Sequence, residues 1–182
     1  YFRFFSAYDI SGTIEFSRYV HDFESGFVEG TEFFLNGRAP YWVPQHAPES
    51  FSRRPAEELL DQPCRPAFVR SWHNHLDNYG NYQPGYCGGL SWGSAEDLER
   101  LVGSPVDPVE KPVLARIAAD DFAGLLELAR GEGFEPATEG YYSKCHLCEE
   151  IRLHLHGRGG YAELTPDGYY REIAEAKRQA GQ

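Results

Sequence analysis

Four cysteines are the residues of this 182-residue chain whose type and spacing could do the most specific chemistry. Cys145 and Cys148 form a Cys-x-x-Cys step, Cys87 lies in a glycine-rich stretch, and Cys64 lies in a Pro-Cys-Arg-Pro run. Four thiolates from such segments can surround one metal centre tetrahedrally, either a zinc ion or an iron–sulfur cluster. The sequence therefore predicts a single metal site with all four cysteines as ligands, and it leaves the two metals open.

Two metal-free uses of the same cysteines are weaker interpretations. Disulfide-rich scaffolds are usually small and dense in cysteine, whereas this chain has 4 cysteines in 182 residues. A redox dithiol formed by Cys145 and Cys148 stays open, because such pairs open a helix after a strand and residues 139–142 could form a short strand.

The histidines offer a second, weaker zinc set. It would combine the Cys-x-x-Cys step with two histidines, namely Cys145, Cys148, His154 and His156, and it would leave the other two cysteines unused. His73 and His75 share one face of a predicted strand and could be ligands, hydrogen-bond donors or exposed polar residues. The chain has no phosphate-binding loop ending in Gly-Lys-Ser/Thr and no nucleophile elbow, so no catalytic residue is predicted.

Charge and hydropathy limit the partners. A formal net charge of −11 argues against binding to a nucleic-acid backbone, which needs a basic surface. No stretch approaches the roughly 20 consecutive apolar residues of a membrane span, and no basic-then-apolar secretory leader opens the sequence. We therefore expect no nucleic acid and no membrane among the partners, and a cytoplasmic location.

The N-terminal third predicts a different architecture from the rest. Residues 1–40 show a strand–helix–strand pattern of the size of a βαβ step. The chain opens on a bulky apolar run, as a strand entered partway would, which predicts a fragment of a longer protein. Residues 40–55 are proline-rich and predicted to be irregular, and a short helix is expected from Pro55.

The cysteines are expected on a hairpin and on helices. Alternation over residues 69–76 and turn formers from Asp77 to Asn81 predict a β-hairpin. Its return stretch, residues 82–87, would be an edge or broken strand because it contains Pro84, and it ends at Cys87. Helices are predicted from Ser94, over residues 108–117, 122–131 and 148–156, and after Thr165-Pro166.

Two stretches of this sequence together resemble a known family. Residues 73–91 and 140–152 look like the C-terminal part of radical S-adenosylmethionine (SAM) proteins with a twitch- or SPASM-like extension. There a cysteine precedes a hairpin with a glycine in its turn, a second cysteine follows, and more come after a helical stretch. That order is matched by Cys64, Gly80, Cys87 and the Cys145/Cys148 pair. The gap from Gly80 to Cys87 is longer than usual and the later SPASM cysteines are missing, which allows only one auxiliary cluster.

The resemblance implies an α+β fold and an auxiliary role. Residues 1–55 would be the end of a partial α/β (TIM-like) barrel, and residues 56–182 a cysteine-bearing hairpin with a helical cluster-binding region. One [4Fe–4S] cluster on the four cysteines would support electron transfer, substrate binding or structure.

The same resemblance implies that the chain is not catalytic alone. The family's Cys-x-x-x-Cys-x-x-Cys motif, which binds the SAM-cleaving cluster, is not in this sequence. SAM would therefore bind an N-terminal radical SAM domain missing from this chain. The substrate could be a peptide or a small molecule. The alternative function is a structural zinc-binding interaction domain that uses the same four cysteines.

Overall fold

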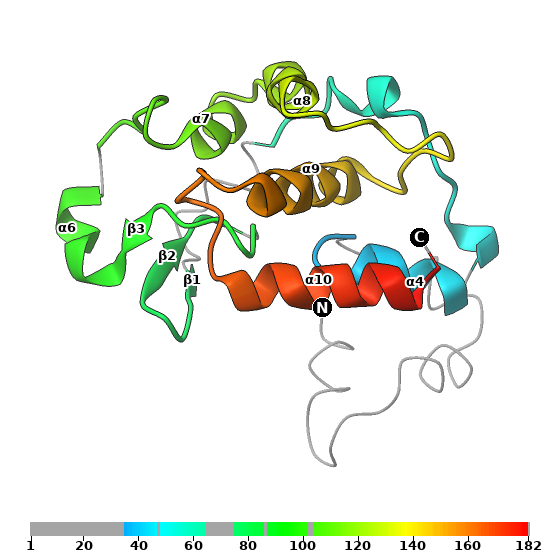
Figure 1. Ribbon diagram of the computed structural model, residues 1–182, viewed down its shortest axis with the longest axis horizontal. Helices are drawn as coiled ribbons and strands as arrows, with labels where there is room; N and C mark the ends of the chain where they lie inside the picture. The colour runs from blue at the N-terminus through cyan, green and yellow to red at the C-terminus, as the bar shows by residue number, and fades with distance from the viewer. Residues whose placement is uncertain (1–34, 47, 65–74, 86, 102–103, 182) are drawn as a thin grey trace, which may run out of the picture.

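The structure is a computed structural model that describes residues 35–46, 48–64, 75–85, 87–101 and 104–181. Within these ranges, helices are combined with one small antiparallel sheet at one end of the molecule, so the predicted α+β class is confirmed (Figure 1). The strand–helix–strand pattern predicted for residues 1–40, and with it most of the expected barrel end, lies outside the described residues.

The proline-rich segment is more regular than its composition predicts. Helix α4 (Ala39–His46) occupies the first part of the stretch that we expected to be irregular, so that prediction was wrong. Pro40 lies in the first turn, where backbone N–H groups have no partner within the helix. Pro44 forfeits one hydrogen bond but is buried, as are Tyr41 and Val43. Two 3₁₀ segments follow, η1 (Pro48–Ser50) and η2 (Ala56–Leu59), the second where a short helix was predicted.

The sheet has three short strands in the order β1-β2-β3. Strands β1 (His75–Leu76) and β2 (Asn81–Gln83) form the predicted hairpin. Strand β2 ends before Pro84, since proline has no N–H to continue the ladder. Strand β3 (Gly93–Ser94) pairs antiparallel with β2 and was not predicted, because two residues carry no periodic signal.

The helices after the sheet begin at side-chain caps and turns. The Ser94 hydroxyl caps η3 (Ala95–Asp97), which continues into α6 (Leu98–Leu101). Helix α7 (Pro112–Ala118) begins later than the predicted residue 108, because the Asp107 carboxylate accepts hydrogen bonds from two following amides and closes a turn. The last three helices are α8 (Phe122–Gly131), α9 (Lys144–Arg158) and α10 (Asp167–Gln179).

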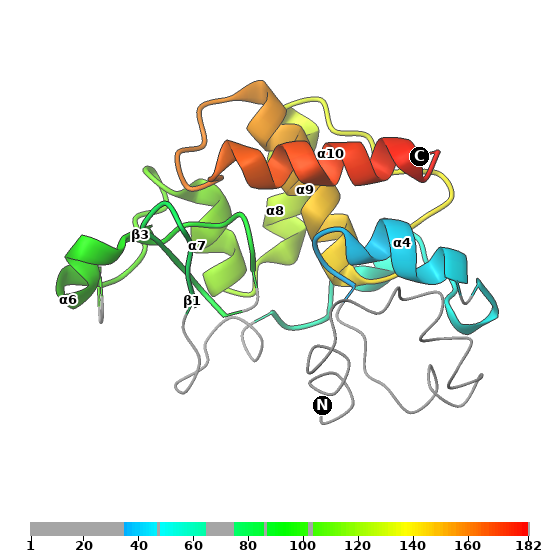
Figure 2. The same ribbon diagram turned by 90° about the horizontal axis from the view of Figure 1, so that it is seen from below.

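Helix α9 lies at the centre of the described structure. It is flanked by α8 on one side and by α10 on the other (Figure 1), and it crosses behind α10 in Figure 2. Its apolar residues join those of α7 and α8 in the core, including Leu114, Ile117, Phe122, Leu125, Leu147, Ile151 and Leu155. Among the described helices, none is both long enough and apolar enough to cross a membrane.

Candidate metal centre

Helix α9 carries two of the four cysteines. Cys145 and Cys148 lie in its first two turns, and a spacing of three residues puts them on the same helix face. The helix begins at Lys144, four residues before the predicted start, because the Ser143 hydroxyl caps it by accepting a hydrogen bond from the amide of His146 at 3.0 Å. Both thiols are therefore held by a capped helix and not by a loop.

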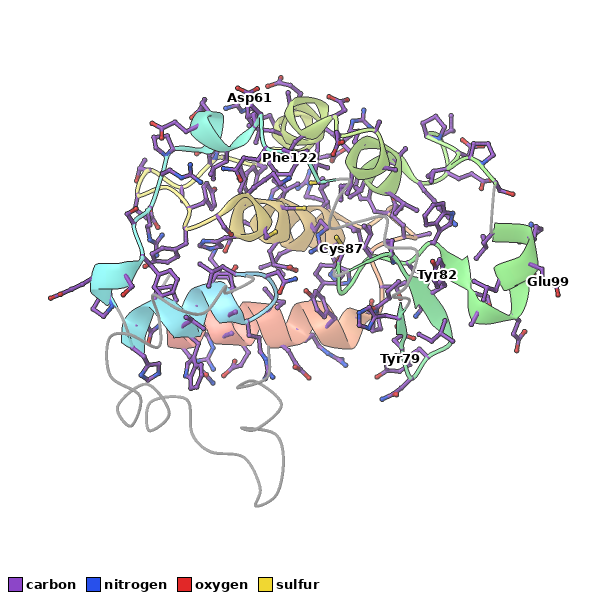
Figure 3. All side chains as sticks on the ribbon, turned by 180° about the vertical axis from the view of Figure 1, so that it is seen from behind. Asp61, Tyr79, Tyr82, Cys87, Glu99 and Phe122 are labelled. Carbon is purple, nitrogen blue, oxygen red and sulfur yellow. The ribbon has the colours of Figure 1, made fainter. Side chains whose placement is uncertain are left out.

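The loop that bears Cys87 is held by helices α9 and α10. The Arg152 guanidinium donates a hydrogen bond from Nη1 to the carbonyl of Gly88 at 2.6 Å. The Tyr170 hydroxyl, on α10, donates to the carbonyl of Gly89. Figure 3 shows Cys87 next to α9.

The glycines of this loop let the Tyr169 ring approach its backbone. A Cβ at Gly89 would lie 2.3 Å from Tyr169 Cδ1, and one at Gly88 would lie 2.9 Å from Cε2. Gly89 also has a φ of +74°, which side-chain-bearing residues rarely adopt. The glycine-rich stretch around Cys87 is thus explained by packing against α10.

Cys64 is tied to the same core through its backbone. Its amide donates to Asp120 Oδ1 at 2.6 Å, in the turn between α7 and α8. The buried Lys144, beside Cys145 on α9, donates from Nζ to the carbonyl of Gln62 at 2.7 Å. The segment that ends at Cys64 is therefore held close to the start of α9.

The four cysteines affect one another's ionisation, and we call them the four-thiol group: Cys64, Cys87, Cys145 and Cys148. All four are free thiols. Burial raises the pKa of Cys87 to about 12 and also raises the pKa of Cys145 and of Cys148. The Cys64 thiol raises the pKa of all three as well, which requires that it lies near each of them.

The four-thiol group is not a ready-made site for a single metal ion. In the part of the chain that the structure describes, no three His, Cys, Asp or Glu side chains are close enough to hold one metal ion. Zinc bound at about 2.3 Å by four sulfurs would hold them roughly 3.8 Å apart. The donor type fits a zinc ion or an iron–sulfur cluster, and the described side chains form no ready-made site for a single ion.

A buried ion pair that sequence reasoning missed adjoins the four-thiol group. Arg152 Nη2 lies 2.7 Å from Glu149 Oε2, and the two side chains are 3% and 0% exposed. The Tyr169 hydroxyl donates to the same carboxylate oxygen at 3.0 Å, as does the amide of Gly37 at 3.2 Å. A Glu–Arg pair three residues apart on a helix is usually solvent-exposed, so the sequence carried no signal of this burial.

His146, between the two cysteines of α9, packs and hydrogen-bonds within the protein. Its ring lies among three tyrosines, Tyr41, Tyr141 and Tyr142, and Nδ1 accepts a hydrogen bond from the amide of Tyr142 at 3.3 Å. Burial lowers its pKa to about 3, so the ring is neutral at physiological pH.

The weaker zinc set is not assembled. His154 Nε2 lies 3.0 Å from the carbonyl of Glu132, and His156 Nε2 lies 3.1 Å from Asp167 Oδ1 while its ring stacks on Tyr170. His75 is exposed on β1, and His73 lies outside the described residues.

Comparisons with known proteins add nothing about the role of these residues. Family models, curated proteins and solved structures give no match to this chain. What the chain offers chemically is four free thiols from three segments and a buried arginine beside them.

Proposed function

We propose that this chain is the auxiliary-cluster region of a radical SAM enzyme and binds one [4Fe–4S] cluster. Its ligands would be Cys64, Cys87, Cys145 and Cys148. The observation that carries the proposal is the four-thiol group itself, in which Cys64 acts electrostatically on the other three thiols although it is far from them in sequence. Thiolates in one place are the ligand set of iron–sulfur clusters.

The order of the cysteines favours a cluster over zinc, because it resembles that of the auxiliary-cluster region of radical SAM proteins. In a four-iron cluster each thiolate binds a different iron, so the sulfurs lie farther apart than around one ion. A structural zinc site remains the second candidate, because four thiols drawn closer together would suit it equally in ligand type.

Within this proposal the chain's residues bind and enclose the cluster. Four cysteines would occupy every iron, which favours an electron-transfer or structural role over substrate binding at iron. SAM and its cleaving cluster would belong to an N-terminal domain, and residues 1–55 to the end of its partial barrel. The unknown substrate, a peptide or a small molecule, would meet that domain in a reducing cytoplasm, where thiols persist.

The test is anaerobic purification followed by iron, sulfide and zinc analysis and an absorption spectrum. About four irons and four sulfides per chain support the proposal. One zinc without iron would make the chain a structural zinc domain. Absence of metal, with a reversible Cys145–Cys148 disulfide, would make it a redox dithiol protein. His154→Ala is the matched control, because it should leave the metal content unchanged if the four cysteines are the ligands.

A further inference from the structure

Arg152 is a buried cation with one nitrogen, Nε, left without a hydrogen-bond partner among the described residues. Its Nη1 donates a hydrogen bond to the carbonyl of Gly88 at 2.6 Å, and its Nη2 donates one to the carboxylate of Glu149 at 2.7 Å. Its Nε has no hydrogen-bond partner in the described part of the chain. A buried N–H without a partner costs free energy comparable to a lost hydrogen bond, so its presence points to a missing acceptor.

The guanidinium is placed beside helix and loop ligands alike. Arg152 follows Cys148 by one turn of α9, on the same helix face, and its Nη1 donates to the carbonyl of Gly88, the residue after Cys87. Its charge lowers the pKa of the Cys87, Cys145 and Cys148 thiols, against the effect of burial. Lys144 lowers the pKa of Cys145 as well, but its ammonium is bound to the carbonyl of Gln62. Among the described residues, Arg152 is therefore the cation placed to act on both the loop and the helix ligands.

Four thiolates around a cluster carry excess negative charge into a partly buried place. Such charge is costly unless a cation or hydrogen-bond donors compensate it. Hydrogen bonds to the sulfurs and the net charge nearby are also what set the reduction potential of a cluster.

We propose that Arg152 is a positioning residue of the four-cysteine centre, which fixes the Cys87 loop and sets the cluster's reduction potential through its buried charge. This inference rests on the proposed function. The Nε–H group is the donor left for a cluster or thiolate sulfur. Glu149 acts in the opposite direction, because its carboxylate offsets part of the Arg152 charge while Tyr169 and the Gly37 amide hold it in place.

The two members of the pair therefore predict shifts of opposite sign. One-electron reduction adds a negative charge to a cluster, and a nearby cation stabilises the reduced form. Removing the cation in Arg152→Gln should lower the potential, and removing the anion in Glu149→Gln should raise it. We expect at least a tenfold change in the reduction equilibrium for each, a shift of about 59 mV for one electron.

The experiment is a reductive titration of the iron-loaded wild-type chain and its variants, followed by electron paramagnetic resonance. Arg152→Lys keeps the charge and should lie closer to wild type than Arg152→Gln. Arg130→Gln is the matched control, because Arg130 pairs with two exposed glutamates on the surface and should leave the potential unchanged.

The outcomes separate the two claims. Opposite shifts in Arg152→Gln and Glu149→Gln support the inference, and a purely structural role would not give them. If Arg152→Gln loses its cluster, the direction of the shift in Glu149→Gln decides. Unchanged potentials in loaded variants overturn the inference and leave the proposed function standing. A wild-type chain that binds no iron overturns the proposed function and the inference with it.

Discussion

At Cys87, burial and the nearby thiols both oppose ionisation, so the proposed metal would have to stabilise the thiolate. Burial raises the pKa of this thiol to about 12. The charge of Arg152 lowers the pKa, and the nearby Cys145 and Cys64 thiols raise it further. A metal ligand must be deprotonated, so metal binding displaces the proton. A metal bound by Cys87 would therefore have to supply free energy that the folded chain alone does not.

We expect Cys87→Ala to abolish metal retention and to destabilise the hairpin, because one of four ligands is lost and the loop after β2 loses its anchor. The measurement is the metal-to-protein ratio after desalting, together with a denaturant melt. Ser91→Ala is the control: it removes a buried hydroxyl bonded to Asn81 Oδ1 at 3.2 Å but no ligand. It should lose stability and keep the metal. Unaltered metal content in Cys87→Ala would refute the four-cysteine site.

Asp77 organises the hairpin turn through its carboxylate. It accepts hydrogen bonds from the amides of Tyr79 and Asn81 at 2.8 and 2.9 Å, and from Asn81 Nδ2 at 2.8 Å. Slight burial raises its pKa, but the hydrogen bonds from Asn81 and Tyr79 outweigh this and hold the pKa below the usual 3.8. A turn residue with these contacts matters for the hairpin and not for metal chemistry.

The lowered pKa of Asp77 gives the hairpin a pH dependence. The folded state binds this proton more weakly than the unfolded state, so the stabilisation is full well above pH 3.8 and is lost as pH falls through the folded pKa. The protection factor for hydrogen exchange at the amide of Asn81, which corrects for the intrinsic pH dependence of exchange, should therefore fall in acid. Asp77→Asn should remove that dependence, and Asp77→Ala should cost about 1 kcal/mol without loss of metal. Equal acid sensitivity in Asp77→Asn would contradict this account.

At the scale of elements, α10 determines where the Cys87 loop can lie. Gly89 and Gly80 both have positive φ, +74° and +79°, but only Gly89 faces the Tyr169 ring. The two glycines thus share a backbone requirement and differ in the space around them.

We expect Gly80→Ala to cost roughly 1–2 kcal/mol from backbone strain alone. Gly89→Ala should cost more and should reduce metal retention, because its Cβ would lie 2.3 Å from Tyr169 Cδ1, whereas nothing lies within 4 Å of a Cβ at Gly80. Denaturant melts and metal analysis of the two variants make the comparison. Equal losses of stability, with the metal kept in both, would mean that the ring yields and does not position the loop.

At the scale of the whole molecule, the proposed centre joins segments that the chain brings together from far apart. Cys64 precedes the sheet, Cys87 follows β2, and the other two cysteines open α9. A ligand that binds only the folded state raises the free energy of unfolding, by about 2.7 kcal/mol at 100 times its Kd.

We therefore expect the metal-loaded chain to unfold at a higher denaturant concentration than the same chain after chelation. The loss should be cooperative, because one centre holds three segments. A variant with alanine at all four cysteines is the control, and it should melt at the same denaturant concentration before and after chelation. Identical melts of loaded and chelated wild-type protein would exclude a structural contribution of the metal.

Local chemistry explains which elements the sequence predicted. The Asp121 cap and the apolar face up to Gly131 define α8, Pro166 precedes α10, and the Asp77 turn fixes the hairpin. Each depends on contacts within a few residues. Three features were missed. Helix α7 starts late because the Asp107 carboxylate closes a turn before it, and α9 starts early because Ser143 caps it. Helix α4 forms in a proline-rich stretch because its prolines are buried.

The sequence by itself determined the candidate ligands: four cysteines, two of them three residues apart on one helix, with no cysteine to spare. Only the tertiary structure decided that Cys64 and Cys87 lie near α9, that His154 and His156 bond elsewhere, and that Arg152 and Glu149 are buried beside the thiols. The physical reason is that periodicity and capping act over a few residues. Burial and charge, in contrast, depend on which distant segments pack against a helix.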